Sequence, residues 1–140
     1  MVQSRRTILF ADDDEGVRNS FGRYLRKFFN DYNLEILHEG NSLEGRLTAD
    51  VSDVALVVLD HNMPPGKTGG EIVKQYARRL KDIPFILYYA GGVEIGEEAR
   101  QDGAFAHVSK LEETKTLLEI MGDALAYFNT ESHLSMPSSR

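Results

Sequence analysis

Acidic residues at two places in the sequence, together with one lysine, could carry out phosphate chemistry. Asp12, Asp13 and Asp14 stand together in "ADDDEG", Asp60 opens "DHNMPPGKTGG", and Lys110 lies in "VSKLEE". Several carboxylates beside one lysine resemble a hard-cation site, because Mg²⁺ prefers oxygen ligands and often binds through one or two carboxylates plus a substrate phosphate. An acyl phosphate on an aspartate would supply that phosphate. The residue types therefore suggest Mg²⁺ and a phosphorylated aspartate.

The letters "GKT" in the same stretch raise the alternative of a nucleotide-binding loop. A phosphate-binding P-loop has the pattern G-x-x-x-x-G-K-[ST], whose early glycine lets backbone amides wrap the phosphates. His61 occupies that early position here. The pair Pro64 and Pro65 also removes amide donors from the loop. We interpret "PPGKTGG" as a turn leading into a helix and keep nucleotide binding as the weaker alternative.

The elements that must position these residues follow from hydrophobic patterning. Helical periodicity covers residues 17–28, 72–80 and 118–128, with shorter patterns at 43–47 and 93–103. Some of the apolar runs between them are almost continuously apolar, which is typical of central parallel strands. Strict alternation predicts an α/β doubly wound parallel sheet with helices on both faces. The expected strands are residues 7–11, 34–38, 54–59, 84–90 and 104–108.

The candidate residues all follow predicted strands. In an open parallel sheet, sites form beyond the carboxyl ends of the strands, where Asp12 and Asp13, Asp60 and Lys110 are expected. Each acidic residue also has an ordinary interpretation: Asp14 is predicted to cap a helix, and Asp60 alone could be a turn residue. Their joint occurrence at three strand ends favours a functional site.

Length and composition narrow the choice of protein class. The 140 residues fit one domain, predicted at residues 1–128, followed by a flexible C-terminal tail or truncated linker at residues 129–140. The absence of cysteine excludes disulfides and thiolate metal sites. A net charge of -6 argues against direct nucleic-acid binding. No apolar run approaches the roughly 20 residues that span a membrane, so a cytoplasmic protein without a membrane partner is expected.

The ordered motifs over about residues 6–128 resemble the receiver domain of two-component response regulators, the CheY-like family. This resemblance implies a flavodoxin-like, five-stranded parallel sheet of order 2-1-3-4-5 with five helices. In that family a sensor histidine kinase or phosphotransfer protein phosphorylates an aspartate, and the resulting switch changes partner binding. A homodimer through the fourth helix, fifth strand and fifth helix is possible. The chain would then be no enzyme, beyond assisting its own phosphorylation and dephosphorylation.

The resemblance assigns a role to each matching residue. Asp60 corresponds to the phosphoacceptor, and Asp12 and Asp13 to the acidic pair that holds Mg²⁺ with it. Asn62 would give its backbone carbonyl to the metal, and Lys110 would pair with the carboxylate and then with the phosphoryl oxygen. These roles fit phosphoryl transfer, which needs positioning and neutralisation of spread negative charge.

Several positions depart from the family pattern. Tyr89 stands at the switch position of a threonine or serine, where it should turn outward or intrude over Asp60. His107 stands where a tyrosine or phenylalanine is common, and the loop after "NMP" has one extra residue. Leu111 replaces a proline that follows a cis bond. Because a cis bond before a non-proline residue costs about 3–4 kcal/mol, a trans bond is expected, with the possibility that Lys110 is displaced.

These departures leave two other functions open. The first is a pseudo-receiver, an interaction module that works without phosphorylation. The second is a phosphatase or phosphotransferase of the haloacid dehalogenase type, whose nucleophile would lie in the D-x-D pattern at Asp12 to Asp14. No cap region or substrate pocket fits the remaining length, which makes this alternative the weaker one.

Overall fold

Strands and helices alternate throughout the computed structural model, which describes the backbone of residues 5–138 and side chains up to residue 128. The five strands are parallel and lie in the order β2-β1-β3-β4-β5, which confirms the doubly wound fold expected from the sequence. The elements are β1 (Thr7–Ala11), α1 (Glu15–Phe28), β2 (Asn33–Leu37), α2 (Gly40–Leu47), β3 (Val54–Leu59), α3 (Gly69–Tyr76), β4 (Phe85–Tyr89), α4 (Val93–Gln101), β5 (Ala106–Ser109) and α5 (Thr114–Ser138).

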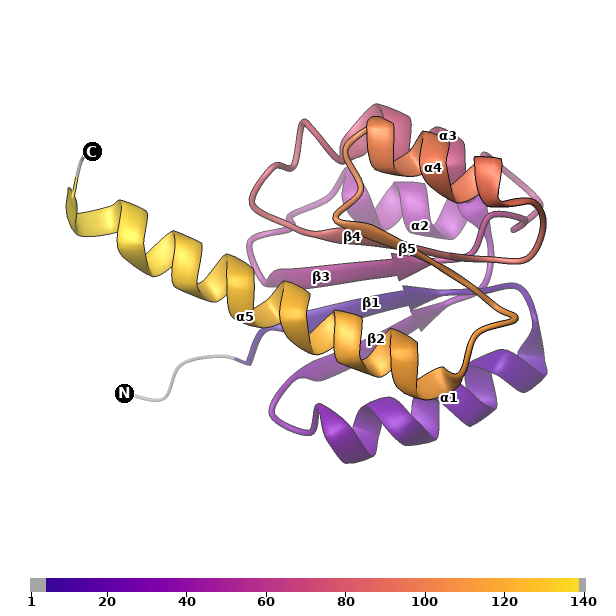
Figure 1. The fold of residues 1–140 in the computed structure, drawn as a ribbon, viewed down its shortest axis with the longest axis horizontal. Helices are drawn as coiled ribbons and strands as arrows, with labels where there is room; N and C mark the ends of the chain where they lie inside the picture. The colour runs from indigo at the N-terminus through magenta and orange to yellow at the C-terminus, as the bar shows by residue number, and fades with distance from the viewer. Residues whose placement is uncertain (1–4, 139–140) are drawn as a thin grey trace.

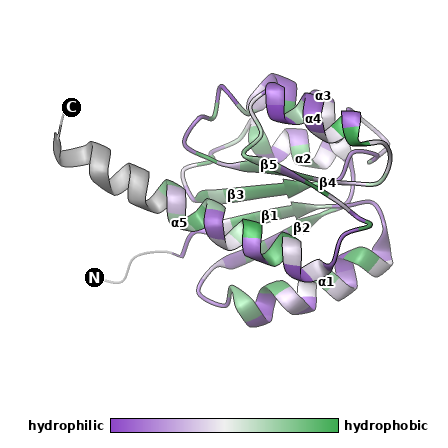
Figure 2. Cartoon of the chain, in the orientation of Figure 1, coloured by the Kyte–Doolittle hydropathy of each residue, from purple (hydrophilic) through white to green (hydrophobic). Residues whose placement is uncertain are grey.

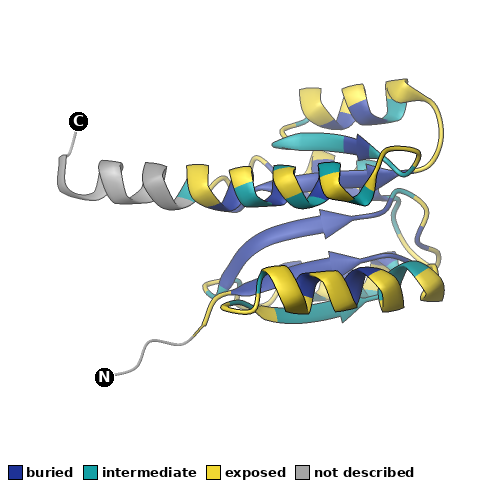
Figure 3. Ribbon diagram, turned by 60° about the horizontal axis from the view of Figure 1, so that its bottom comes forward, coloured by how far each residue is buried: buried dark blue, intermediate teal, exposed yellow. Residues whose placement is uncertain are grey.

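Two helical layers sandwich the sheet (Figure 1). Helices α1 and α5 cover one face, where Phe21 and Met121 belong to one apolar cluster. Helices α2, α3 and α4 cover the other face, where Leu43 and Ile72 belong to a second cluster. The strands between them are the most hydrophobic part of the chain (Figure 2). Because both faces are covered, every residue of β1, β3 and β4 is buried (Figure 3).

Local hydrogen bonds explain where the observed elements differ from the predicted ones. Strand β5 begins at Ala106 instead of Ala104 because the turn after α4 continues that far. Gly103 has a positive φ of 116°, and the Ala104 N–H still donates to Ala99 O at 3.0 Å. Helix α3 ends at Tyr76, although a further turn follows in which the Leu80 N–H donates to Tyr76 O.

The last helix is longer than the predicted pattern over residues 118–128, because α5 runs from Thr114 to Ser138. A flexible tail or truncated linker at residues 129–140 stays a prediction. After Gly122 the sequence has no helix breaker before Pro137, so nothing in the chain stops the helix at Phe128. The boundary of the domain at residue 128 stays a prediction. Within the described residues, no helix is both long and apolar enough to cross a membrane.

Candidate functional site

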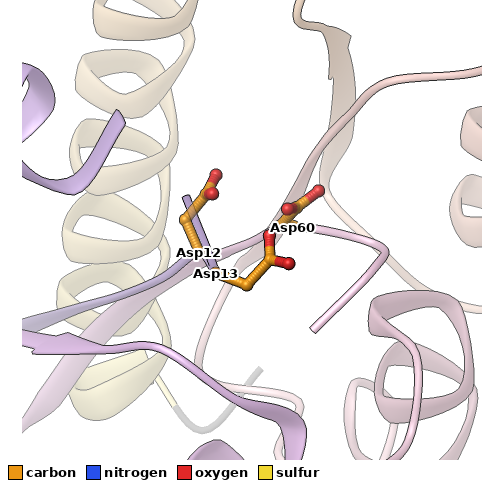
Figure 4. Close-up of side chains that lie close together, drawn as sticks. All are labelled: Asp12, Asp13 and Asp60. Atoms are coloured by element: carbon orange, nitrogen blue, oxygen red, sulfur yellow. The ribbon is translucent and has the colours of Figure 1, made fainter. Parts of the chain in front are cut away.

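The ends of β1 and β3 bring three carboxylates together. The Asp12 N–H donates to Leu37 O at 3.1 Å, and the Asp60 N–H donates to Ala11 O at 2.9 Å, so neighbouring strands fix both backbones. Side-chain oxygens of Asp12, Asp13 and Asp60 lie within 4.8 Å of one another (Figure 4). Asp12 and Asp60 are buried, whereas Asp13 is exposed. The three acidic residues predicted from the strand ends thus form one cluster.

Lys110 completes this cluster from the end of β5. Its Nζ lies 2.8 Å from Asp12 Oδ2 and 3.1 Å from Asp60 Oδ2. Its backbone N–H donates to Tyr89 O at 2.7 Å, which holds the start of the loop against β4. Among the described residues only the Pro64–Pro65 peptide is cis, so the bond before Leu111 is trans, as expected. The displacement of Lys110 considered from the sequence does not occur.

The electrostatics of the cluster favour a bound cation. Burial, and then the charge of Asp12, raise the pKa of Asp60 to about 6, although Lys110 and the His61 N–H partly oppose this rise. Burial lowers the pKa of Lys110, but its hydrogen bond to Asp12 and the charges of both aspartates raise it above the ordinary value overall. Three carboxylates facing one lysine leave excess negative charge at the site.

The donor set fits a hard cation such as Mg²⁺. All three side chains offer carboxylate oxygens, the ligands that this ion prefers. Asp12 Oδ2 is buried and has no hydrogen bond among the described residues, apart from its ion pair with Lys110. Exposed Asp13 leaves one side of the cluster open to water, which Mg²⁺ usually keeps among its ligands. Asn62, two residues after Asp60, is exposed, and the role of its carbonyl stays a prediction.

The loop after Asp60 gives the "GKT" letters structural roles. Lys67 Nζ forms an ion pair with Glu44 Oε2 at 2.8 Å, which ties the loop to α2. Thr68 and Glu71 form a capping box at the start of α3. The interpretation of this stretch as a turn into a helix is therefore confirmed.

Asp14 also has the predicted capping role. Its Oδ1 accepts a hydrogen bond from the Val17 N–H at 3.0 Å at the start of α1. Meanwhile the Asp14 N–H donates to Asp12 Oδ1 at 2.9 Å and orients that carboxylate. The third aspartate thus supports the site without belonging to the cluster.

Sequence reasoning missed one residue that shapes the site, Gly69. A Cβ at this position would lie 2.0 Å from Asp60 O and 2.9 Å from a side-chain atom of Leu87. Its N–H donates to His61 O at 2.7 Å, and the His61 N–H donates to Asp60 Oδ1 at 2.7 Å. The start of α3 therefore packs directly on the backbone of the candidate phosphoacceptor. The "GG" after "KT" was the available signal.

Tyr89 turns away from the carboxylate cluster toward α4 and β5. It is fully buried, and its hydroxyl lies 3.2 Å from His107 Nδ1. A Cβ at Gly96 of α4 would meet His107 Nδ1 at 2.1 Å and the Tyr89 hydroxyl at 2.6 Å. Both predicted switch residues therefore meet over a glycine, in the gap between the sheet and α4. Of the two orientations expected for Tyr89, it turns outward from the site and does not intrude over Asp60, but it stays buried because Gly96 leaves room for the ring beneath α4.

Comparison with known proteins decides what kind of domain this is. A family model described as the response regulator receiver domain matches residues 8–121, most of the chain. The chain belongs to the response regulator receiver family. A search of curated proteins gave no match. Membership leaves the haloacid dehalogenase alternative without support, because that alternative places its nucleophile after the first strand.

Solved receiver domains have the same fold. The CheY-like receiver domain protein from Methanospirillum hungatei JF-1 is 22% identical, with a TM-score of 0.79 over 91% of this chain and 99% of that one. A receiver domain protein from Clostridium thermocellum is 18% identical, with a TM-score of 0.77 over 92% and 98%. The beryllofluoride-activated NtrC4 receiver domain dimer is 19% identical, with a TM-score of 0.74 over 87% and 98%.

Proposed function

We propose that Asp60 of this receiver domain accepts a phosphoryl group from a phosphohistidine of a sensor kinase or phosphotransfer protein, in a Mg²⁺-dependent reaction. The observation that carries this proposal is the position of Lys110 Nζ between the Asp12 and Asp60 carboxylates at one edge of the sheet. The chain would act on itself only, by assisting its own phosphorylation and dephosphorylation. The cytoplasmic location expected from the sequence stays a prediction.

The geometry around Asp60 suits an attacking carboxylate. The His61 N–H holds Oδ1 at 2.7 Å, so the group has a fixed orientation, while Oδ2 faces Lys110. With a pKa of about 6, Asp60 is mostly ionised at neutral pH. An oxygen of Asp60 forms the new bond to phosphorus as the bond from phosphorus to the donor imidazole nitrogen breaks. Lys110 then pairs with a phosphoryl oxygen.

The acidic pair has a separate role in this reaction. Mg²⁺ held by Asp12, Asp13, Asp60 and the carbonyl of Asn62 would neutralise charge on the phosphoryl oxygens. Asp12 is oriented for this role by its hydrogen bond from the Asp14 N–H. Gly69 keeps α3 close to the Asp60 backbone, which limits movement of the acceptor during transfer.

The output of this domain is proposed to pass through α4, β5 and α5, with a kinase or phosphotransfer protein upstream. A homodimer through this face is one form of output, and the similar NtrC4 receiver is a dimer in its beryllofluoride-activated form. Tyr89 and His107 join β4 to β5 beneath α4. A change at Asp60 that moved the end of β4 would therefore reach α4 through this pair.

A phosphorylation-independent interaction module is the second candidate function. The observation that favours it is the hydrogen bond between Tyr89 and His107, because it engages the hydroxyl away from Asp60. In that case α4 would keep one position whatever the state of the site.

The test is incubation with acetyl phosphate, or with beryllofluoride, in the presence and absence of Mg²⁺. Intact mass reports the covalent adduct and backbone NMR shifts report its reach. The proposal expects a Mg²⁺-dependent adduct that Asp60→Asn abolishes, with shifts extending to His107. Shifts confined to the site would support the second candidate for output, and no adduct under any condition would refute the phosphoacceptor role.

A further inference from the structure

Large apolar side chains exposed on the surface gather in two places of opposite charge. Five large apolar side chains are exposed among the described residues. Two of them lie on α1 with basic neighbours, and two lie at α4 and the loop after β5 with acidic neighbours. An exposed apolar group rimmed by charge is typical of a protein interaction site. The five exposed side chains are Tyr24, Phe28, Val93, Leu111 and Tyr127.

The first group, the basic aromatic patch, consists of Arg23, Tyr24, Lys27 and Phe28. These residues are exposed and follow helical spacing on α1. Figure 3 shows that the outer side of this helix is exposed. The rings of Tyr24 and Phe28 stack with centroids 6.4 Å apart, and Lys27 Nζ lies 5.5 Å from the Phe28 centroid. Neither Arg23 nor Lys27 forms an ion pair with an acidic side chain that the structure describes. This patch therefore offers a preformed aromatic surface and two cations.

The second group, the acidic apolar patch, consists of Val93, Glu94, Glu97, Leu111 and Glu112. Leu111 is 95% exposed and Val93 is 58% exposed. Both parts of the patch start from the end of β4: Ser109, whose N–H donates to Glu112 Oε2 at 3.4 Å, pairs with Tyr89, and α4 begins soon after Tyr89 at Val93. After burial, the charges of Glu112, Glu97 and Glu94 also raise the pKa of the Tyr89 hydroxyl. None of the three forms an ion pair with a basic side chain in the described part of the chain.

The two patches cannot meet within one molecule. Helix α1 packs on one face of the sheet and α4 on the other (Figure 1). Each patch offers the charge that the other needs, around apolar side chains that the described part of the chain leaves exposed. We propose that the basic aromatic patch of one copy binds the acidic apolar patch of another copy, so that the receiver associates head to tail.

The form and strength of this association follow from the patches. Because different surfaces meet, the contact is heterologous and repeats from copy to copy, unlike a symmetric dimer through α4, β5 and α5. A contact between one helix face and one helix end buries much less surface than the about 1,600 Å² of a standard protein interface. The association is therefore weak, concentration-dependent and sensitive to salt. It does not require phosphorylation of Asp60.

Sedimentation velocity measures this association. The protein concentration is varied from about 10 µM to about 500 µM, at about 50 mM and at about 500 mM NaCl. The wild type and Asp60→Asn should both show a weight-average mass that rises with concentration at low salt and much less at high salt. Arg23→Glu/Lys27→Glu and Glu97→Lys/Glu112→Lys should each shift the rise to at least about tenfold higher concentration. Far-UV circular dichroism checks that the variants fold.

Charge exchange separates this contact from other associations. A mixture of the two double variants should regain assembly, because each then offers the charge that the other needs. The chain with all four reversals should associate with itself again, and Lys81→Glu, an exposed reversal outside both patches, should behave as wild type. A wild type that stays monomeric throughout, or an assembly that Arg23→Glu/Lys27→Glu leaves unchanged, would overturn the proposal.

Discussion

Replacing Asp60 by asparagine should stabilise the folded protein in the absence of Mg²⁺. Burial and the neighbouring charge of Asp12 raise the pKa of Asp60 from 3.8 to about 6. The folded state therefore binds this proton more tightly than the unfolded state. The contribution of Asp60 to stability is therefore most favourable below about pH 4, falls as the pH rises through about 6, and carries its full penalty at neutral pH.

The size of the effect follows from the same pKa values. At about 1.4 kcal/mol per pH unit, the rise from 3.8 to about 6 corresponds to about 3 kcal/mol of lost stability at neutral pH. Asparagine keeps the shape of the side chain and removes the charge, but its amide pairs less well with Lys110. We therefore expect Asp60→Asn to raise the free energy of unfolding by about 1–3 kcal/mol at pH 7.5.

Urea unfolding followed by circular dichroism, with a chelator present, measures this difference. The gap between Asp60→Asn and wild type should narrow as the pH falls toward 4, and Mg²⁺ should stabilise wild type more than the variant. Asp53→Asn serves as the matched control, because Thr7 and Arg46 lower the pKa of Asp53 and its charge is stabilising. That control should lose stability. An Asp60→Asn variant less stable than wild type at pH 7.5, with unchanged folding, would refute the reasoning.

Four further substitutions test the site and the region beneath α4. Lys110→Met should abolish phosphorylation by acetyl phosphate and lower the free energy of unfolding by about 3 kcal/mol, because two buried carboxylates then face each other unpaired; retained labelling would count against its role. Tyr89→Thr should lower the free energy of unfolding by about 3 kcal/mol and let the NMR shifts caused by beryllofluoride spread further into α4. Unchanged shifts would exclude Tyr89 as the residue that limits movement of α4. Gly96→Ala should lose about 1–3 kcal/mol in urea unfolding, because its Cβ meets Tyr89 and His107. Gly45 also lies within a helix, but a Cβ there would have no atom within 4 Å, so Gly45→Ala should raise the free energy of unfolding by about 0.5–1 kcal/mol. Equal effects of the two alanine substitutions would contradict the packing argument.

The arrangement of the sheet and the acidic cluster could be predicted from the sequence because both depend on regular patterns. Continuously apolar runs mark strands covered on both faces, and parallel strands must end at a common edge. Asp12, Asp60 and Lys110 follow three such strands, so their meeting is a consequence of topology. The distances between them needed the structure, because they depend on loop geometry.

The orientation of Tyr89 could not be predicted because it depends on a contact between distant parts of the chain. The sequence shows a tyrosine at the end of β4 and, separately, a glycine that weakens the pattern of α4. Only the packed structure shows that Gly96 leaves the space into which Tyr89 turns. The length of α5 could not be predicted for a different reason: the hydrophobic periodicity ends near Phe128, but the polar residues that follow contain no helix breaker before Pro137.

The packing of Tyr89 over Gly96 also limits how the sequence can change. The ring of His107 and the hydroxyl of Tyr89 together fill the volume that any larger residue at position 96 would need. The pair of Tyr89 and His107 therefore packs well only beside a glycine at position 96, and a larger residue at 96 fits well only after positions 89 and 107 have both changed. Positions 89, 96 and 107 should consequently vary together among descendants of this protein, with the change at position 96 coming last when its residue becomes larger.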